Sequence, residues 1–170
     1  RRRHSFPTRR SSDLTLLQAL TVDSASRLYP EALQLLAKLQ AVSSEALPLF
    51  DASWLSKEWL WHKEWFLQKW LGMKTIPVAV DAAYDQISAV MLSQPYVFMH
   101  RDYHSANLMV KADQSLGLLD FQDAFHGPLT YDLASLLRDC YIDWPYDQVM
   151  AWAKYYFDLL QATAQRSEER

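Results

Sequence analysis

Apolar positions recur with the period of an α-helix along most of the first half of the chain. From Pro30, the stretch PEALQLLAKLQAV places leucines three and four residues apart, with Pro and Glu in the first turn, which predicts a helix beginning there. A second helix, of about five turns, is expected from the capping residue Asp51 to the terminator Gly72. A third, within PVAVDAAYDQISAVMLSQP, is expected to begin near Asp81.

The second predicted helix carries aromatic residues on several faces. Its apolar residues come in pairs and triplets, such as Trp59 to Trp61, and do not form one stripe. We therefore expect an aromatic core helix that contacts more than one neighbour. A platform that stacks bases or sugars is the less favoured interpretation, and His62, among Trp and Lys residues, is expected at the surface.

The pattern changes after residue 95, where short runs of strand-forming residues replace the helical period. YVFMH, NLMV and SLGLLDF are three such runs, and KADQ between the last two is typical of a hairpin turn. Helical periodicity returns in YDLASLLRDCY and PYDQVMAWAKYYFDLLQAT, the latter with a stripe of Val149, Trp152, Ala153, Tyr156 and Leu160. The pattern predicts an α+β fold, mostly helical, with one small strand insert.

Composition limits the classes of protein that the chain can belong to. Its 170 residues, half of them apolar, suffice for one domain. With a net charge of −3, the chain does not have the excess of basic residues typical of a nucleic-acid binder. No apolar run approaches the roughly 20 residues that span a bilayer. Cys140 is the only cysteine and is expected to be buried as a small apolar residue. We expect a cytoplasmic protein without nucleic-acid or membrane partners.

The first fourteen residues, RRRHSFPTRRSSDL, differ from the rest of the chain. They do not begin with Met and carry five arginines without an apolar core, so they are not a secretory signal. A mitochondrial presequence and a solvated basic tail are alternatives, but the string resembles a translated sequencing adapter. We expect residues 1–14 to be a non-native tail and residues 15–170 to form the fold, as a fragment of a longer protein.

Polar residues are concentrated between the strand-like runs, in HRDYHSAN. Asp102 and Asn107 lie five residues apart, and Asp120 follows Asp102 by eighteen, at the end of the second hairpin strand. Strand ends hold site residues rigidly. One carboxylate can deprotonate an acceptor hydroxyl, while an amide oxygen and a second carboxylate can hold Mg²⁺ on nucleotide phosphates. Each of these three residues could therefore have its own role in phosphoryl transfer.

HRDYHSANLMV followed by LLDFQD resembles the catalytic loop and metal-binding segment of the protein-kinase-like superfamily. The resemblance implies that Asp102 is the catalytic base and that Asn107 and Asp120 are Mg²⁺ ligands. It also implies that His100 and Arg101 organise the loop without reacting.

The segment after Asp120 indicates a branch of that superfamily. Only eleven residues separate Asp120 from Asp132, and no A-P-E motif follows, unlike in protein kinases. DFQDAFHGPLTYDLASLL resembles the aminoglycoside phosphotransferase and choline kinase family, in which the Asp of D-L-A braces the catalytic loop. Asp132 is thus implied as structural support, although an Asp that opens a helix would also act as its N-cap. The implied fold is the mostly helical C-terminal lobe of a kinase-like fold, with a small β-hairpin carrying the site.

Together with EWFLQKWLG, these motifs resemble the bacterial kinases that phosphorylate N-acetylmuramate and N-acetylglucosamine at the anomeric hydroxyl in cell-wall recycling. The resemblance covers roughly residues 15 to 160 and implies ATP and Mg²⁺ as cofactors and a small-molecule, amino-sugar substrate. Asp123, Arg138 and Asp139 are candidate substrate contacts. For Arg138 and Asp139, a structural ion pair is the simpler alternative.

Other functions compete with this one. A kinase for an aminoglycoside or a choline-like alcohol is the first alternative, and a non-catalytic pseudokinase or helical interaction module is the second. A hydrolase with zinc on His104, His126 and Asp102 is disfavoured because zinc sites need further ligands. No Gly-rich loop or strand lysine precedes Leu14, so the chain is expected to lack the ATP-binding N-terminal lobe, to be truncated at its C-terminus and to be inactive alone.

Overall fold

The computed structural model describes residues 13–168, which form two compact units, each with its own hydrophobic core. Unit 1 contains the described residues up to Leu39 together with residues 102–122 and 132–168, and unit 2 contains residues 40–101 and 123–131. The chain, expected to form one domain, passes between the units four times, after Leu39, Arg101, Gln122 and Tyr131. Most of the predicted tail lies outside the described residues. Its last residue, Leu14, pairs with Val110.

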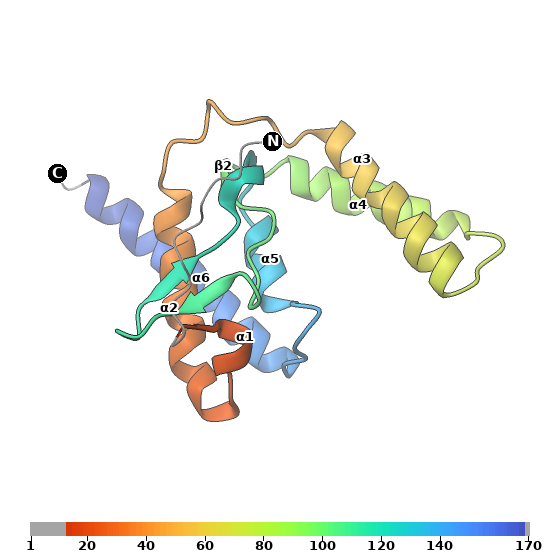
Figure 1. Cartoon of the computed structure of the whole chain (residues 1–170). Helices are drawn as coiled ribbons and strands as arrows, with labels where there is room; N and C mark the ends of the chain where they lie inside the picture. Colours follow the sequence, from red (N-terminus) through yellow and green to blue (C-terminus); the bar gives the residue numbers. More distant parts are fainter. Residues whose placement is uncertain (1–12, 169–170) are drawn as a thin grey trace, which may run out of the picture. The chain divides into compact units, whose positions relative to one another are not determined.

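Unit 1 combines a small antiparallel sheet with several helices (Figure 1). The sheet has the strand order β1 (Leu14–Thr15), β3 (Leu108–Val110), β4 (Leu116–Leu118). Strand β3 pairs with β4 so that Leu108 lies opposite Leu118, which confirms the predicted hairpin. The helices are α1 (Leu16–Ala19), α2 (Val22–Gln40), α5 (Tyr131–Leu137) and α6 (Tyr146–Glu168), of which Gln40 and Tyr131 belong to unit 2. A 3₁₀ turn (Phe121–Asp123) follows β4.

Helix α2 begins at Val22, and the prediction that it begins at Pro30 is wrong because that proline lies inside the helix. Thr21 and Ser24 cap it reciprocally: the Ser24 N–H donates to Thr21 Oγ1 (3.1 Å) and the Thr21 N–H donates to Ser24 Oγ (2.8 Å). Pro30 has no N–H to donate within the helix, but the helix continues through it. The buried face continues across it, through Ala25, Leu28, Tyr29, Ala32, Leu33 and Leu36.

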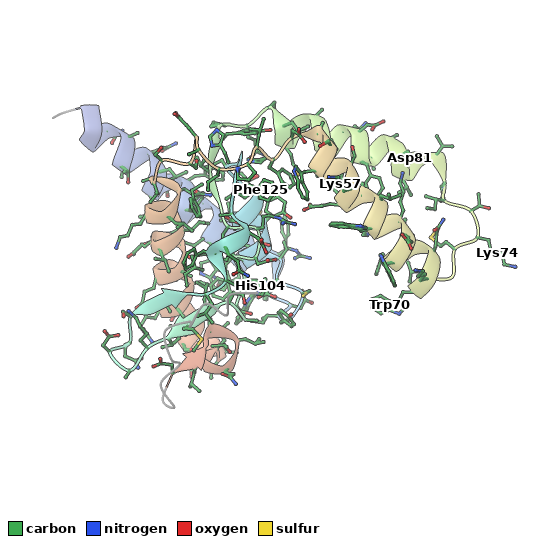
Figure 2. The ribbon with its side chains drawn as sticks, turned by 45° about the horizontal axis from the view of Figure 1, so that its top comes forward. Lys57, Trp70, Lys74, Asp81, His104 and Phe125 are labelled. Carbon is green, nitrogen blue, oxygen red and sulfur yellow. The ribbon has the colours of Figure 1, made fainter. Side chains whose placement is uncertain are left out.

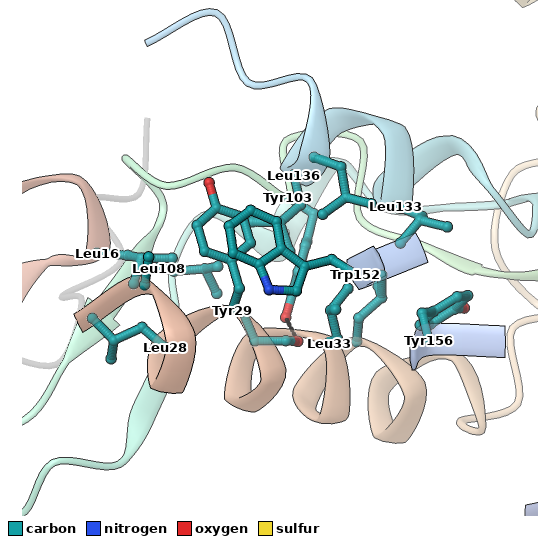
Figure 3. Close-up of a cluster of buried hydrophobic side chains, with 14 of the residues drawn as sticks. Leu16, Leu28, Tyr29, Leu33, Tyr103, Leu108, Leu133, Leu136, Trp152 and Tyr156 are labelled. Carbon is teal, nitrogen blue, oxygen red and sulfur yellow. Dashed lines mark hydrogen bonds between the residues drawn. The ribbon is translucent and has the colours of Figure 1, made fainter. Parts of the chain in front are cut away.

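The core of unit 1 is rich in aromatic side chains (Figure 3). The Tyr29 ring stacks on the Trp152 ring with centroids 3.9 Å apart, and the Trp144 indole N–H donates to the Tyr29 hydroxyl (2.7 Å). The predicted stripe on α6 is confirmed, because Val149, Trp152 and Tyr156 are buried. Tyr103, from the loop before β3, is part of this core.

Unit 2 contains a two-stranded antiparallel sheet. Strand β2 (Tyr96–Met99) pairs with β5 (Phe125–Pro128), with Met99 opposite Phe125. The expectation of a single strand insert is therefore wrong. Strand β5 escaped prediction because it contains Gly and Pro, residues that usually weaken or end strands, and it forms through pairing with β2.

A helical hairpin makes up the rest of unit 2 (Figure 1). Helix α3 (Ala52–Trp61) continues into the π-helical segment η1 (His62–Trp70), which is followed by α4 (Val78–Leu92). Helix α3 begins after the N-cap Asp51, whose Oδ1 accepts from the Trp54 N–H (3.1 Å), and Gly72, with φ 68°, follows the end of η1. Both boundaries were predicted, whereas α4 begins three residues before Asp81.

The expectation of an aromatic core helix is wrong. Within residues 52–70, all described by the structure, only Leu55 and Leu67 are buried, whereas Trp61, Trp65 and Trp70 are exposed. A two-helix hairpin has one buried seam, and apolar residues on several faces cannot all reach it. Trp70 lies near the loop end of this hairpin (Figure 2). His62 is exposed, as predicted, and its Nδ1 is hydrogen bonded to the Tyr84 hydroxyl.

Among the described helices, none has the length and hydropathy needed to cross a membrane.

Candidate active site

The loop before β3 holds Asp102 at the surface of unit 1. On its C-terminal side, Tyr103 is fully buried, and its hydroxyl donates to the carbonyl of Ala32 in α2 (2.7 Å). Ser105 is also fully buried, and its backbone N–H donates to Asp139 Oδ2 (2.8 Å). Because these neighbours are anchored, the exposed Asp102 side chain is presented to solvent from a fixed loop. We call residues 102–107 the catalytic loop, after the role predicted for this segment.

Asn107 closes the loop against Asp102. Its side-chain Nδ2 donates to the backbone carbonyl of Asp102 (3.1 Å), and its own backbone N–H donates to the carbonyl of His104 (2.9 Å). Because the amide NH₂ group donates to that carbonyl, the Oδ1 atom of Asn107 is left to accept a hydrogen bond or to bind a metal ion.

The hairpin brings Asp120 to the same end as Asn107. The Leu119 N–H donates to the Asn107 carbonyl (3.0 Å), one bond beyond the ladder that joins β3 and β4. Asp120 follows with φ 60°, in the left-handed region that Asp tolerates better than most residues. In the part of the chain that the structure describes, the carboxylates of Asp102 and Asp120 have no hydrogen-bonded or ion-paired partner. Both are exposed and available to a ligand.

The oxygen donors of Asn107 and Asp120 fit Mg²⁺, which prefers oxygen ligands and binds through few protein groups together with water and phosphate. The zinc alternative finds no support in residues 13–168, where no three His, Cys, Asp or Glu side chains gather as a metal site. His126, invoked for that alternative, instead shares a hydrogen bond between its Nδ1 and the Ser44 hydroxyl (2.8 Å) in unit 2.

Arg101 is held within unit 2 by aromatic and acidic side chains. Its Nη2 lies 3.8 Å from Glu58 Oε1, and its guanidinium lies over the rings of Trp54 (5.7 Å) and Phe125 (5.2 Å). The Tyr131 hydroxyl donates to the same Glu58 carboxylate (3.1 Å). Arg101 has φ 77°, a conformation that persists in a non-glycine residue when its surroundings hold it.

His100 and Asp132, the other two residues predicted to support the loop, are both fully buried. His100 follows β2 in unit 2, and Asp132 is the second residue of α5 in unit 1. Asp132 therefore lies inside the first helical turn and does not occupy the N-cap. Burial raises the pKa of the Tyr103 and Tyr156 hydroxyls, and the nearby negative charge of Asp132 raises both pKa values further. Asp132 thus lies beside the buried anchor of the loop.

Among the candidate substrate contacts, Asp139 is fixed, whereas Asp123 and Arg138 are exposed. Asp139 Oδ2 accepts from the Ser105 N–H (2.8 Å), and Asp139 Oδ1 accepts from the Tyr141 N–H (2.9 Å). In the described chain no ion pair joins Arg138 to Asp139, so that simpler alternative is wrong. The Asp139 carboxylate instead ties the segment after α5 to the catalytic loop.

Sequence reasoning missed the contacts that hold this loop. Ser105 carries no chemistry of its own, and its partner lies 34 residues away, so no local pattern indicated it. His104 was considered only as a metal ligand. Cys140, expected to be buried, is exposed because α5 ends at Leu137 and leaves it in the following turn.

A match to protein-family models decides the family of the chain. The model of the "phosphotransferase enzyme family" matches residues 10–169. The chain belongs to the phosphotransferase enzyme family. The family predicted from the catalytic-loop and D-L-A segments is thereby confirmed.

Curated relatives of this family member carry one functional name. A protein from Pseudomonas putida named N-acetylmuramate/N-acetylglucosamine kinase is 36% identical over 153 residues, which cover 87% of this chain and 44% of the relative. Proteins of the same name from Pseudomonas aeruginosa and Neisseria meningitidis serogroup B are 36% and 35% identical and are covered over 43% and 45% of their lengths. The chain thus spans less than half the length of these relatives.

A solved structure shows the fold of the family member. The choline kinase LicA from Streptococcus pneumoniae superimposes with a TM-score of 0.62 at 16% sequence identity, over 86% of this chain and 49% of that chain. The predicted α+β, kinase-like fold is confirmed.

Proposed function

We propose that the protein containing this chain transfers the γ-phosphoryl group of ATP to the anomeric hydroxyl of N-acetylmuramate or N-acetylglucosamine. One observation carries the chemistry: Asp102 is an exposed carboxylate on an anchored loop, and Asn107 and Asp120 lie at the same end of the adjoining hairpin. The acceptor is taken from the names of the curated relatives. Because ATP is supplied in the cytoplasm, we propose that the reaction takes place there.

In this proposal the chain's own residues orient the acceptor and hold the nucleotide. Asp102 accepts the proton of the sugar hydroxyl as its oxygen attacks the γ-phosphorus in line with the departing ADP. Asn107 Oδ1 and the Asp120 carboxylate would hold Mg²⁺, which neutralises charge on the phosphates when bound. His100, Arg101 and Asp132 keep the loop in place. Most of the rate enhancement then comes from positioning and charge neutralisation.

Arg138 is proposed to contact the acceptor. N-acetylmuramate differs from N-acetylglucosamine by a lactyl ether that ends in a carboxylate, and a guanidinium pairs with a carboxylate through charge-assisted hydrogen bonds. Arg138 is exposed in the segment that Asp139 ties to the catalytic loop. We propose that Arg138 recognises this carboxylate.

The test is a coupled assay of ADP formation with the intact gene product, because this chain spans less than half the length of its relatives. ATP and Mg²⁺ are supplied with N-acetylmuramate, N-acetylglucosamine, choline or an aminoglycoside. We expect both amino sugars to stimulate ADP formation and the product to be the sugar 1-phosphate, identified by ³¹P NMR. Stimulation by choline or the aminoglycoside alone would overturn the acceptor. No stimulation by any acceptor would support the non-catalytic alternative.

A further inference from the structure

His104, labelled in Figure 2, lies in the catalytic loop between Asp102 and Asn107. The rings of His104 and Tyr141 meet edge to face, with centroids 5.8 Å apart and an interplanar angle of 60°. The backbone of Tyr141 is itself fixed by Asp139 (2.9 Å). The imidazole is therefore in contact with a ring whose backbone Asp139 holds in place.

The imidazole also approaches the side chain of Asn107. His104 Nε2 lies 3.4 Å from Asn107 Nδ2, and the same Nδ2 lies 3.1 Å from the Asp102 carbonyl oxygen. A carbonyl oxygen can only accept, so the NH₂ group of the amide must face it. The second N–H of that group is then directed at His104, which must offer an unprotonated Nε2. In a neutral imidazole this places the proton on Nδ1.

The two acceptors together determine which way the amide points. In the opposite amide orientation, Oδ1 would face the Asp102 carbonyl, acceptor against acceptor, and the NH₂ group would face the cation position. That orientation would lose the hydrogen bonds that the NH₂ group donates to the Asp102 carbonyl and to His104 Nε2, so it is disfavoured. Nδ1 of His104 is buried and has no hydrogen-bond partner among the described residues, so no acceptor there favours a proton on Nδ1 and the tautomer is set by the contact at Nε2 alone.

We infer that His104 is a positioning residue: as the Nδ1–H tautomer it accepts a hydrogen bond from Asn107 and thereby keeps Asn107 Oδ1 directed at the divalent cation. The inference rests on the proposed function only for the identity of Asn107 as a ligand. His104 touches neither substrate nor cation and acts through Asn107. Outer partners of metal ligands commonly contribute about 10–100-fold to metal affinity.

The first test uses the metal-free intact protein. Two-bond ¹H–¹⁵N correlation spectra of ¹⁵N-histidine-labelled protein report the tautomer of each ring, and comparison with His104→Gln assigns the His104 signals. We expect Nδ1 protonated and Nε2 unprotonated, whereas free histidine prefers the opposite tautomer. The Nε2–H tautomer would overturn the inference. This result depends on neither the acceptor nor catalysis.

The second test measures Mn²⁺ binding by electron paramagnetic resonance in the presence of a non-hydrolysable ATP analogue. His104→Leu, which offers no acceptor, should weaken Mn²⁺ binding about tenfold, the lower end expected for an outer partner. His104→Gln, whose Oε1 can accept from Asn107, should stay within about threefold of the wild type, since it replaces one neutral acceptor by another. His62→Leu, a matched change at an exposed histidine of unit 2, should have no effect.

Kinetics separate positioning from general damage. In His104→Leu the Mg²⁺ concentration for half-maximal activity should rise, while kcat at saturating Mg²⁺ recovers most of its value. Equal Mn²⁺ affinity in His104→Leu and the wild type would overturn the inference, as would equal weakening in His104→Gln and His104→Leu. A protein that shows the tautomer and the Mn²⁺ effect but phosphorylates neither amino sugar would refute the proposed function and leave the role of His104 intact.

Discussion

The carboxylate of Asp139 accepts a hydrogen bond from the backbone N–H of Ser105 at 2.8 Å, joining two segments 34 residues apart in the sequence. Both partners are buried. A hydrogen bond from a backbone N–H to a buried carboxylate is charge-assisted and short. The second Asp139 oxygen accepts from Tyr141. Asp139 therefore makes the position of the catalytic loop dependent on the segment after α5.

Asp139→Asn should loosen this connection. The amide has one oxygen for two N–H donors, and its NH₂ group would face the other donor, so we expect a loss of about 1–3 kcal/mol in the free energy of unfolding of this region. Hydrogen exchange followed by mass spectrometry should show faster exchange in the peptide that contains Ser105, together with a lower kcat. Asp143→Asn, at an exposed aspartate of the same segment, is the control. Equal exchange in both variants would contradict the role of Asp139.

Asp102→Asn should abolish most of the activity without unfolding the protein. The side chain is exposed and has no side-chain partner in the described residues, so its loss removes a base and no packing. General-base catalysis contributes about 10²–10⁴-fold, and kcat for sugar phosphorylation should fall by that factor while the melting temperature and ATP affinity stay unchanged. The matched control is Asp85→Asn on α4. A variant with the kcat of the wild type would remove Asp102 from the role of base.

Arg138→Gln should change the preference between the two amino sugars. Loss of a hydrogen bond to a charged group costs about 1.5–3 kcal/mol, so kcat/KM for N-acetylmuramate should fall roughly ten- to a hundredfold. N-acetylglucosamine has no carboxylate, and its kcat/KM should change little. Lys154→Gln, which removes an exposed positive charge from α6, is the control. An equal loss with both sugars would rule out recognition of the carboxylate by Arg138.

Stability should fall in alkaline solution because of buried tyrosines in unit 1. Burial raises the pKa of Tyr29 to about 12 and that of Tyr103 well above its ordinary value. The unfolded chain releases these protons near pH 10 and the folded chain keeps them, so the folded state binds more protons. The free energy of unfolding therefore declines above about pH 10, by about 1.4 kcal/mol per pH unit for each such tyrosine. For Tyr29 the decline ends near pH 12.

Tyr103→Phe isolates one of these contributions. The variant loses the hydrogen bond to Ala32, which should lower stability by about 1 kcal/mol at neutral pH. It also removes one titrating group, so the decline of stability with pH should be shallower than in the wild type. Urea denaturation at a series of pH values on both sides of pH 10 measures both effects. An unchanged slope would show that Tyr103 titrates normally in the folded protein.

Gly127→Ala should destabilise the small sheet of unit 2. A Cβ at this position would lie 2.6 Å from Met99 Sδ and 3.1 Å from Phe50 Cβ. The Met99 side chain can move, but Phe50 Cβ is attached to the backbone, so we expect a cost of about 1–3 kcal/mol for overpacking. Gly117→Ala, whose Cβ would have no neighbour closer than 3.8 Å, is the control. Differential scanning calorimetry should show a lower melting temperature only for Gly127→Ala.

Local patterns predicted the elements whose signals lie within their own sequence. The KADQ turn between two apolar runs gave the β3–β4 hairpin, and the N-cap Asp51 marked the start of α3. The patterns failed where packing between distant segments decided the outcome. Pro30 lies inside α2 because buried residues on both sides of it share one core, and β5 exists only because β2 offers it a partner.

The candidate site follows the same division. The spacing of Asp102, Asn107 and Asp120 predicted phosphoryl-transfer chemistry, and the resemblance of the surrounding motifs to known sequences predicted the family that the comparisons confirm. It gave no information on Asp139 as the partner of Ser105, on the amide orientation of Asn107, or on the exposure of Trp65 and its neighbours. Those properties depend on side chains from other parts of the chain.

By itself, the sequence determined the residue types at the site, their order along the hairpin and the family. The order follows from a local pattern, because the KADQ turn pairs the two strands whose ends carry these residues, and the family follows from the resemblance of the motifs. Only the tertiary structure decided which groups hold the loop. A buried backbone N–H must find an acceptor wherever the fold provides one, and for Ser105 that acceptor is Asp139, 34 residues along the chain.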